Sequence, residues 1–504
     1  MNIRLKYAIA SVALSITIGS CSRDFLDVKP VGRTLEVNHY QSQEQAFEAL
    51  VSIYDVLQWN DQNGYTMQHL LLNVASDDTY AGGSDASDQP SWVATNNFTF
   101  DPNLGPHSGF WKKAYRGIFR ANYYIQLIDN VPNTSESFKT RTKAEAKFLR
   151  AKFYLDLMRL FGNAPLITEP QGADDYFKLV IPGPSGLMTQ IATDLTDAIV
   201  DLPITVSGNE MGRVTKSAAQ ALLARAHLFS NDALKMSDVA SLCEDVINSN
   251  LYSLEPNFAD IFDRQHEYGV ESIFEIAYTE SSLQGWWQFG SGGGEGNVGT
   301  QFIGMRDYNG PTYATGWGFC PVSTELVSAM SSDPRFTHTI IDAAALQGAS
   351  YTAGYQNTGY FMKKYAPIQA NAALDGDVAL NWGTNTRMIR YADVLLMAAE
   401  GLARSGSESS ALIYLNQVRN RVGLPPLSSS GSQLLEDIYN ERRLELALEG
   451  HRFHDLVRTG KAVEVLGSQG YQSHNQWFPI PQNEIDASTG ANGTPALTQN
   501  PGYN

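Results

Sequence analysis

Residues 390–404, RYADVLLMAAEGLAR, and residues 411–424, ALIYLNQVRNRVGL, decide the fold class of this chain. In both segments apolar side chains recur at intervals of three and four residues, which is the pattern of a helix buried along one face. These apolar positions are Tyr391, Val394, Leu395, Ala398, Leu402, Leu412, Leu415, Val418 and Val422. Because only a short SGSES stretch separates the segments, they predict two antiparallel helices.

The next segment, which ends in ERRLELALEGHRFHDLVRTG at 441–460, has apolar residues on two sides of a predicted helix. One side carries Leu435, Ile438 and Leu446, and the other carries Leu444 and Leu448. A helix covered on two faces lies inside a stacked layer, as in helical-repeat proteins.

Helical periodicity also occurs in the first half of the chain. The segments are Glu44–Gln58, Phe110–Asn130, Thr142–Phe161 and Gly212–Ser230. The third of them is followed by Gly162 and Pro165, which are typical helix stops. LRAKFY and LARAHLF echo one another in the last two, and their spacing fits tetratricopeptide-like helix pairs of about 34 residues. A short strand is predicted at ESIFEIAY, residues 271–278.

Composition describes an ordinary globular chain of 504 residues, 43% hydrophobic and 18% charged. The formal net charge is −17, and no basic run occurs. This charge argues against nucleic acid and against an anionic membrane surface as the main partner.

The N-terminus has the pattern of a secretory signal peptide. Arg4 and Lys6 precede an apolar run at 7–18, which is too short to span a bilayer and is followed by Gly19, Ser20 and Cys21. A cysteine at the cleavage point resembles a bacterial lipoprotein signal, so we expect a signal peptide at 1–20 and a lipidated tether at 21–38. The alternative is an ordinary signal peptide with a chance cysteine.

Five blocks in the second half occur in one order up to the C-terminus: RYADVLLMAAE, LNQVRNRVG, ERRLELALEGHRFHDLVRTGK, FPIPQNEI and LTQNPGY. Together they resemble the SusD/RagB family of surface glycan-binding lipoproteins. The resemblance implies a mainly α fold, with tetratricopeptide-like helix-turn-helix repeats that form a right-handed superhelical scaffold. It also implies outer-membrane attachment through lipid on Cys21, and oligosaccharide or polysaccharide binding without catalysis or cofactor. Cargo would pass to a SusC-like TonB-dependent transporter, over which the protein would lie as a lid.

We therefore divide the mature chain into three parts. Residues 39–260 form a helical, tetratricopeptide-like half, 261–384 a loop-rich ligand-binding subregion with few short strands, and 385–504 the C-terminal SusD-like helices and tail.

Ligand contacts are expected from two loop regions in which Gly, Asp and aromatic residues lack helical period: 77–100 and about 280–320. Large aromatic side chains on loops suit the stacking of sugar rings, and polar neighbours suit hydroxyl groups. The aromatic candidates are Trp286, Trp287, Trp317, Tyr313, Trp92 and Tyr80. The polar candidates are Asp78, Asn96, Arg306 and Asp307. The alternative for each loop tryptophan is that it fixes its own loop against the helices.

Other constellations are interpreted as structural. Glu441, Glu445 and Glu449 form a four-residue ladder that arginines on this or the next helix would neutralise, and HRFHD lacks the spacing of HExxH. Arg442, Arg443, Arg452, His451 and His454 complete this set. SGGGEGNVG lacks the features of a phosphate loop.

Metal and disulfide chemistry is not expected. Asp77, Asp78, Asp85 and Asp88 lack EF-hand spacing, so Ca²⁺ is only an open alternative. Pairing of Cys243 with Cys320 is disfavoured, because one lies in a helical pattern and the other in a loop-rich region.

Three other functions stay open. A helical glycoside hydrolase or lyase would need two carboxylates about 5–5.5 Å or 6.5–9.5 Å apart, with Asp307 near Trp317 the first suspect. A peptide-binding uptake lipoprotein or an interaction scaffold would need no sugar site.

Overall fold

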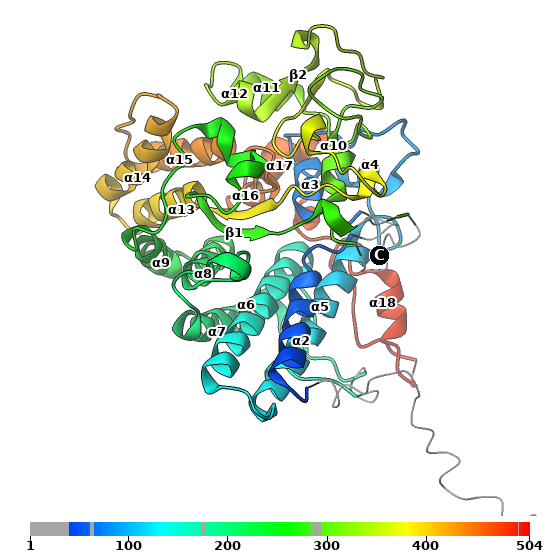
Figure 1. Ribbon diagram of the computed structural model, residues 1–504, viewed down its shortest axis with the longest axis vertical. Coiled ribbons are helices and arrows are strands. Elements are labelled where there is room, and N and C mark those ends of the chain that lie inside the picture. Colours follow the sequence, from blue (N-terminus) through cyan, green and yellow to red (C-terminus); the bar gives the residue numbers. More distant parts are fainter. Residues whose placement is uncertain are drawn as a thin grey trace, which may run out of the picture.

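The computed structural model describes residues 40–60, 65–172, 175, 177–282, 285–286, 294–491 and 493–503. The expected signal peptide, Cys21 and the tether lie outside these residues. The described chain is mainly helical, with two small antiparallel two-stranded sheets (Figure 1). The prediction of a mainly α fold is confirmed.

Six long helices build the first half: α2 (Gln43–Asp55), α5 (His107–Leu127), α6 (Glu136–Phe161), α7 (Gly183–Asp201), α8 (Lys216–Ser230) and α9 (Met236–Asn248). From α5 to α9 each helix packs against the next along the chain, as expected for stacked helix pairs (Figure 1). The sequence analysis missed α7. It placed α6 at Thr142, but the helix begins at Glu136 because Ser135 accepts a hydrogen bond from the Phe138 backbone amide.

The second half contains α13 (Tyr391–Arg404), α14 (Glu408–Arg421), α15 (Gly431–Glu445), α16 (Arg452–Arg458), α17 (Ala462–Leu466) and α18 (Gln482–Ala487). The predicted pair α13 and α14 pack on one another, and α13 also contacts α9 and α15. Because α13 touches both halves, the two sets of helices share one core.

The third predicted helix is interrupted. α15 ends at Glu445, so the prediction that Leu446 and Leu448 lie on its faces is wrong. Leu448 and Gly450 have φ of 68° and 81°, which no helix accommodates. Asn73 holds this turn, because its side chain donates to the Leu448 carbonyl (2.9 Å) and accepts from the Gly450 amide (2.9 Å).

The middle of the chain contains loops and short elements. β1 (Ser272–Ile276) pairs with β4 (Thr386–Arg390), and β2 (Ile340–Asp342) with β3 (Tyr360–Met362). The short helices are α3 (Gln68–Val74), α4 (Pro90–Asn96), α10 (Val298–Ile303), α11 (Thr324–Met330) and α12 (Phe336–Thr339). The strand prediction at 271–278 is confirmed. The loop predicted at 77–100 instead contains α4.

Buried ion pairs join α15 to the rest of the core. Glu445 contacts Arg335 (3.0 Å), Arg390 (3.1 Å) and Arg421 (2.5 Å), and its side chain is fully buried. Glu449 contacts Arg390 at 2.8 Å. The predicted ion pairing of the glutamate ladder is therefore confirmed.

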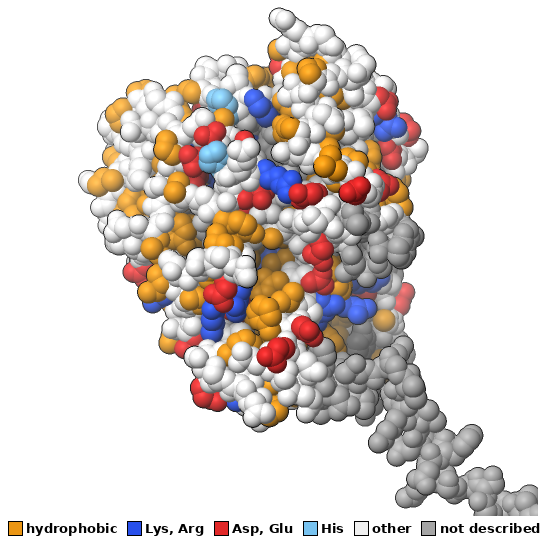
Figure 2. All heavy atoms as spheres, in the orientation of Figure 1, with side chains coloured by type: hydrophobic (Ala, Val, Ile, Leu, Met, Phe, Trp, Pro, Cys, Tyr) orange, Lys and Arg blue, Asp and Glu red, His pale blue; other side chains and the backbone are white. Residues whose placement is uncertain are grey.

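The partners of the ladder differ in part from those expected. Arg419 and Arg421 do come from the neighbouring helix α14, but Arg335 and Arg390 come from distant segments. Arg442, Arg443 and Arg452 instead bind aspartates: Asp393, Asp455, Asp77 and Asp78. On the face shown in Figure 2, basic side chains likewise lie beside acidic ones.

Buried histidines predict acid sensitivity. Burial is the main cause that lowers the pKa of His69, His107 and His451 to about 4. In the unfolded chain the same histidines take up a proton near pH 6.5. The contribution of the neutral, buried histidines to folding stability is therefore complete above pH 6.5 and is lost as the pH falls towards 4. Each contributes at most roughly 3 kcal/mol. We expect urea-unfolding free energy to decline from pH 6.5 to 4.5, before most carboxylates titrate; a flat profile in that window would contradict this account.

Candidate functional site

A backbone crossing fixes the position of Trp317. The amides of residues 316–319 donate to carbonyls of residues 301–305: Gly316 to Met305 (2.8 Å), Trp317 to Gln301 (3.0 Å), Gly318 to Gly304 (2.8 Å) and Phe319 to Phe302 (3.0 Å). The segment is therefore tied along its length to α10 and the residues that follow it. Loops positioned by a scaffold in this way commonly carry function.

The two loop regions expected to form the site do lie together. Cys320 donates to the Ala81 carbonyl (3.0 Å), and Gly83 donates to the Gly318 carbonyl (3.0 Å). Trp92 of α4 packs on Phe302 of α10 with ring centroids 4.6 Å apart, and Figure 1 shows these helices side by side. A third segment joins them, since Tyr355 donates to the Gly83 carbonyl (2.9 Å).

Two predicted tryptophans form a stacked pair at the surface. The ring centroids of Trp286 and Trp317 are 5.8 Å apart, with an interplanar angle of 30°. Trp286 is 42% exposed, and Trp317 is half-buried. Tyr65 meets Trp317 edge-on at 5.9 Å and also contacts the fully buried Phe302. We name Trp286, Trp317 and Tyr65 the aromatic platform; its inner side is anchored in the core.

Polar groups lie around the aromatic platform. Arg306 donates to the Trp317 carbonyl (3.5 Å), and Asp307 is exposed with φ of 50°. Hydrogen bonds from Ser87 lower the pKa of Asp85, and the charge of Arg306 contributes, so this carboxylate lies in electrostatic reach of the guanidinium. Burial raises the pKa of Tyr65, with a further contribution from Asp88. The site therefore combines aromatic faces with groups that bind hydroxyls.

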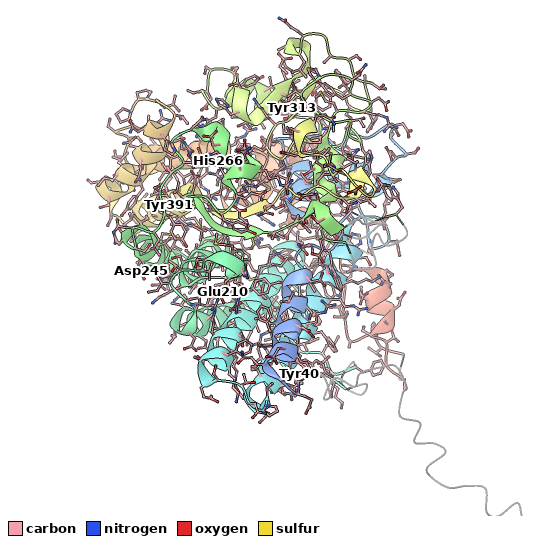
Figure 3. All side chains as sticks on the ribbon, viewed as in Figure 1. Tyr40, Glu210, Asp245, His266, Tyr313 and Tyr391 are labelled. Carbon is pink, nitrogen blue, oxygen red and sulfur yellow. The ribbon has the colours of Figure 1, made fainter. Side chains whose placement is uncertain are left out.

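Two of the predicted aromatic residues do not belong to this surface. Trp92 is completely buried, because α4 turns it towards Phe302. Tyr313 is 5% exposed and packs against Tyr308 in a second small core, in the loop-rich part labelled in Figure 3. Both predictions of ligand contact are wrong for this structure, and both side chains instead hold their segments in place.

Two of the predicted polar residues are also buried and occupied. Asp78 is 0% exposed and contacts Arg443 at 3.2 Å. The Asn96 amide donates to the Val74 carbonyl (3.0 Å), and its side-chain oxygen accepts from Gln356. Because both side chains are buried, neither is presented to a ligand at the surface.

The remaining predicted aromatic residues are Tyr80 and Trp287. Tyr80 is half-buried, and its hydroxyl donates to Glu325 (3.2 Å). Trp287 lies outside the described residues. Tyr65 is a platform residue that the sequence analysis does not predict. The sequence feature that could have indicated it is an aromatic residue directly after Asn63-Gly64, a pair that favours a turn.

The structure offers little to a metal ion in the described residues. Asp77 contacts both Arg443 (2.8 Å) and Arg452 (2.7 Å), so its charge is already balanced. Among the described side chains no group of three His, Cys, Asp or Glu residues comes together as a metal site. Cys243 and Cys320 are both free and buried.

None of the described helices is long and apolar enough to cross a bilayer.

Comparison with known proteins gives a consistent result. Residues 344–503 match the model of the SusD family, and residues 24–228 match a model described as starch-binding, associating with outer membrane. SusD-like protein P25 of Formosa agariphila is 26% identical, over 96% of this chain and 97% of that protein.

Two solved structures are also similar. A laminarin-binding SusD-like protein has 39% identity and a TM-score of 0.86, over 92% of this chain and all of that one. Surface glycan-binding protein A from Bacteroides thetaiotaomicron, in complex with laminarihexaose, has 31% identity and a TM-score of 0.83, over 91% of this chain and 99% of that one.

Proposed function

This chain belongs to the SusD family, and we propose that it binds oligosaccharides at the cell surface through its aromatic platform. The observation that carries the proposal is the Trp286–Trp317 stack at the surface, with Arg306 beside it. The apolar C–H face of a pyranose packs on such a ring and excludes water. By analogy with bases on aromatic platforms, each stacked sugar contributes roughly 1–3 kcal/mol.

We propose laminarin-type glucan as the cargo. Two structural relatives with 39% and 31% identity are named for laminarin binding or were solved with laminarihexaose. These names describe binding and no catalytic activity, which supports a binding protein over the hydrolase or lyase.

We extend the proposal to attachment of the protein to the outer membrane and to delivery of its cargo. The signal-like N-terminus ending at Cys21 supports a lipid anchor, and the outer-membrane description of the matching model supports the location. We propose that a SusC-like TonB-dependent transporter receives the cargo, with this protein as its lid. Co-purification of that transporter with full-length protein, and its loss for Cys21→Ser, would test the arrangement.

Isothermal titration calorimetry of the soluble form from Ser22 tests the sugar site. The panel holds laminarihexaose, maltohexaose and cellohexaose. One saturable heat with laminarihexaose supports the proposed cargo. Saturable heat with another sugar keeps the site but changes the cargo, and sustained heat reveals turnover. No heat with any sugar, in a protein that melts cooperatively, contradicts the proposal.

Substitution of Gly316 is expected to weaken sugar binding although every aromatic ring of the platform is retained. A methyl group at Gly316 would lie 2.2 Å from the Gly304 Cα, so Gly316→Ala must separate the two crossing segments and move Trp317. We expect about tenfold weaker laminarihexaose binding and some loss of stability, measured by calorimetry and thermal melting. Gly467→Ala is the matched control, because a methyl group there meets nothing within 4 Å. Unchanged affinity for Gly316→Ala would show that the crossing does not position the platform.

A further inference from the structure

A cavity of about 100 Å³ lies where the two halves of the chain meet; we name it the charged chamber. Its walls come from α3, α5, α6, α8, β4 and the turn after α15. Five cationic side chains line it: Lys113, Lys152, Arg159, Arg225 and Arg387. The carboxylates that line it are Asp156 and Glu449. His69 and His451 also line it, and burial keeps them neutral near pH 7.

Neither carboxylate balances the excess of positive charge. Asp156 is shared by Lys152 and Arg159. Glu449 binds two cations that do not line the chamber, Arg390 and Lys364. Arg225 pairs with Asp393, which Arg442 also binds.

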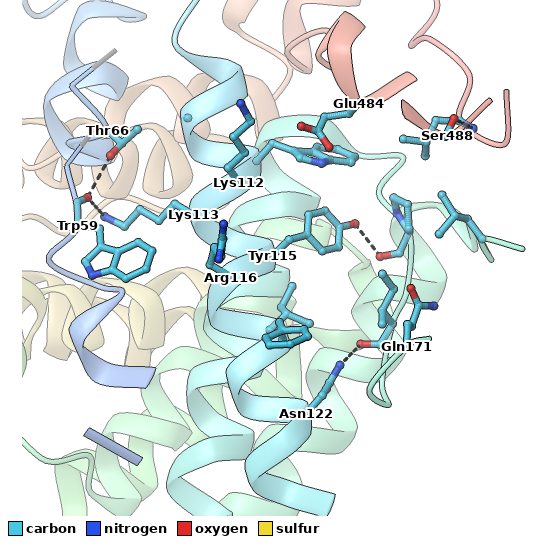
Figure 4. Close-up of a pocket in the computed structure, with 18 of the residues that line it drawn as sticks. Trp59, Thr66, Lys112, Lys113, Tyr115, Arg116, Asn122, Gln171, Glu484 and Ser488 are labelled. Carbon is cyan, nitrogen blue, oxygen red and sulfur yellow. Dashed lines mark hydrogen bonds between the residues drawn. The ribbon is translucent and has the colours of Figure 1, made fainter. Parts of the chain in front are cut away.

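Lys113 makes no direct ion pair with the described side chains, although Asp156 and Asp55 lie near enough to raise its pKa in part. Its ammonium donates to the carbonyls of Leu57 (2.9 Å) and Trp59 (2.8 Å), and Figure 4 shows it extended from α5 towards Trp59. Burial, and then the nearby charge of Lys152, lower its pKa to about 7. A buried ammonium without a counter-charge is unfavourable.

Two further donors in the lining have no acceptor. The Nε–H groups of Arg159 and Arg225 are buried and make no hydrogen bond in the described structure. Arg225 is only 9% exposed. Arg225 pairs with Asp393 through another nitrogen, so its Nε–H stays unused, and both unused N–H groups belong to cationic residues that line the chamber.

The chamber also adjoins a surface groove. Asn60, Thr66 and Lys113 line both the chamber and a surface groove of about 700 Å³ along α5. Lys112 and Arg116 are exposed on the same helix and line that groove (Figure 4). The groove therefore holds three cationic side chains of α5 and two carboxylates, Glu169 and Glu484.

We propose that the charged chamber binds a small inorganic anion of about the size of chloride, held by Lys113, Arg159 and Arg225. The volume is that of roughly three water molecules, which fits a halide with a little water. The anion gives Lys113 a counter-charge in direct contact, accepts the unused N–H groups and links α5, α6 and α8.

The first test compares melting temperatures at constant ionic strength while sodium glutamate is replaced by sodium chloride. Ligand linkage predicts a rise of about 2 °C in chloride. Lys113→Met is expected to lose this rise, whereas the neighbouring exposed Lys112→Met keeps it. An equal rise in both variants would place the ion elsewhere, and no rise in the wild type would mean that the chamber holds only water.

The second test uses only the wild-type protein, so the folding of a variant does not affect it. Crystals of the wild-type protein soaked in sodium bromide should give an anomalous peak in the chamber near Lys113 and Arg225. Peaks confined to the surface would overturn the proposal. Neither test involves sugar, so their outcome is independent of the proposed function.

Discussion

Replacing both Trp286 and Trp317 with alanine is expected to weaken laminarihexaose binding about a hundredfold or more. Each ring that stacks on a sugar contributes roughly 1–3 kcal/mol, so the two rings together contribute roughly 2–6 kcal/mol, which corresponds to about 30-fold to ten-thousandfold in Kd. Trp286→Ala alone should weaken binding about tenfold with little change in melting temperature, because this side chain is 42% exposed. Calorimetry and thermal melting measure both quantities.

The controls separate binding from folding. Phe119→Ala removes an exposed aromatic ring of similar exposure, 45%, from α5, and should leave affinity unchanged. Trp317 is half-buried and rests on Phe302 and Tyr65, so its alanine variant should lose some stability as well. If Trp286→Ala bound laminarihexaose as tightly as the wild type, the platform would not be the sugar site.

Periodicity predicted most of the long helices, because burial of one helix face requires apolar residues at every third or fourth position. α13 and α14 are the clearest cases, since their apolar positions face α9 and one another. Composition misled at 77–100, where Asp, Ser and Gly suggested loop. Pro90 begins a short helix there, and this helix buries Trp92 and Asn96. A residue type suited to sugar does not reveal whether it faces solvent.

The candidate site shows the same limit. Trp286 and Trp317 were selected as loop aromatics, and the structure stacks them. Tyr313 was selected by the same rule, yet it packs against Tyr308 in a separate core. The difference depends on contacts between segments far apart in the chain, such as Gly83 with Gly318, and no local pattern encodes them.

Long-range pairing also decides the ion pairs around Glu445. The sequence predicted that arginines neutralise the ladder, but Arg335 lies 110 residues before Glu445 and Arg390 lies 55 before it. Burial alone would raise the pKa of Glu445, but Arg421, Arg390 and Arg335 hold it well below its usual value. The carboxylate is therefore charged in the native state at neutral pH. Its stabilising effect is complete above about pH 4.5 and is lost only as the pH falls further.

Glu445→Gln should consequently lower the free energy of unfolding by about 3–5 kcal/mol. The amide keeps the shape of the side chain but removes the charge that three buried guanidinium groups share, and those groups have no solvent to compensate them. Urea unfolding at pH 7 measures the loss. Glu436→Gln, whose wild-type carboxylate pairs with Lys461 on the surface, should change stability by less than about 1 kcal/mol. Equal stability of Glu445→Gln and the wild type would mean that the other carboxylates paired with these arginines, which are Asp333, Glu441, Glu271 and Glu449, are sufficient to hold them. The expected loss would instead show that the charge of one glutamate keeps β4, α14 and the segment after α11 together.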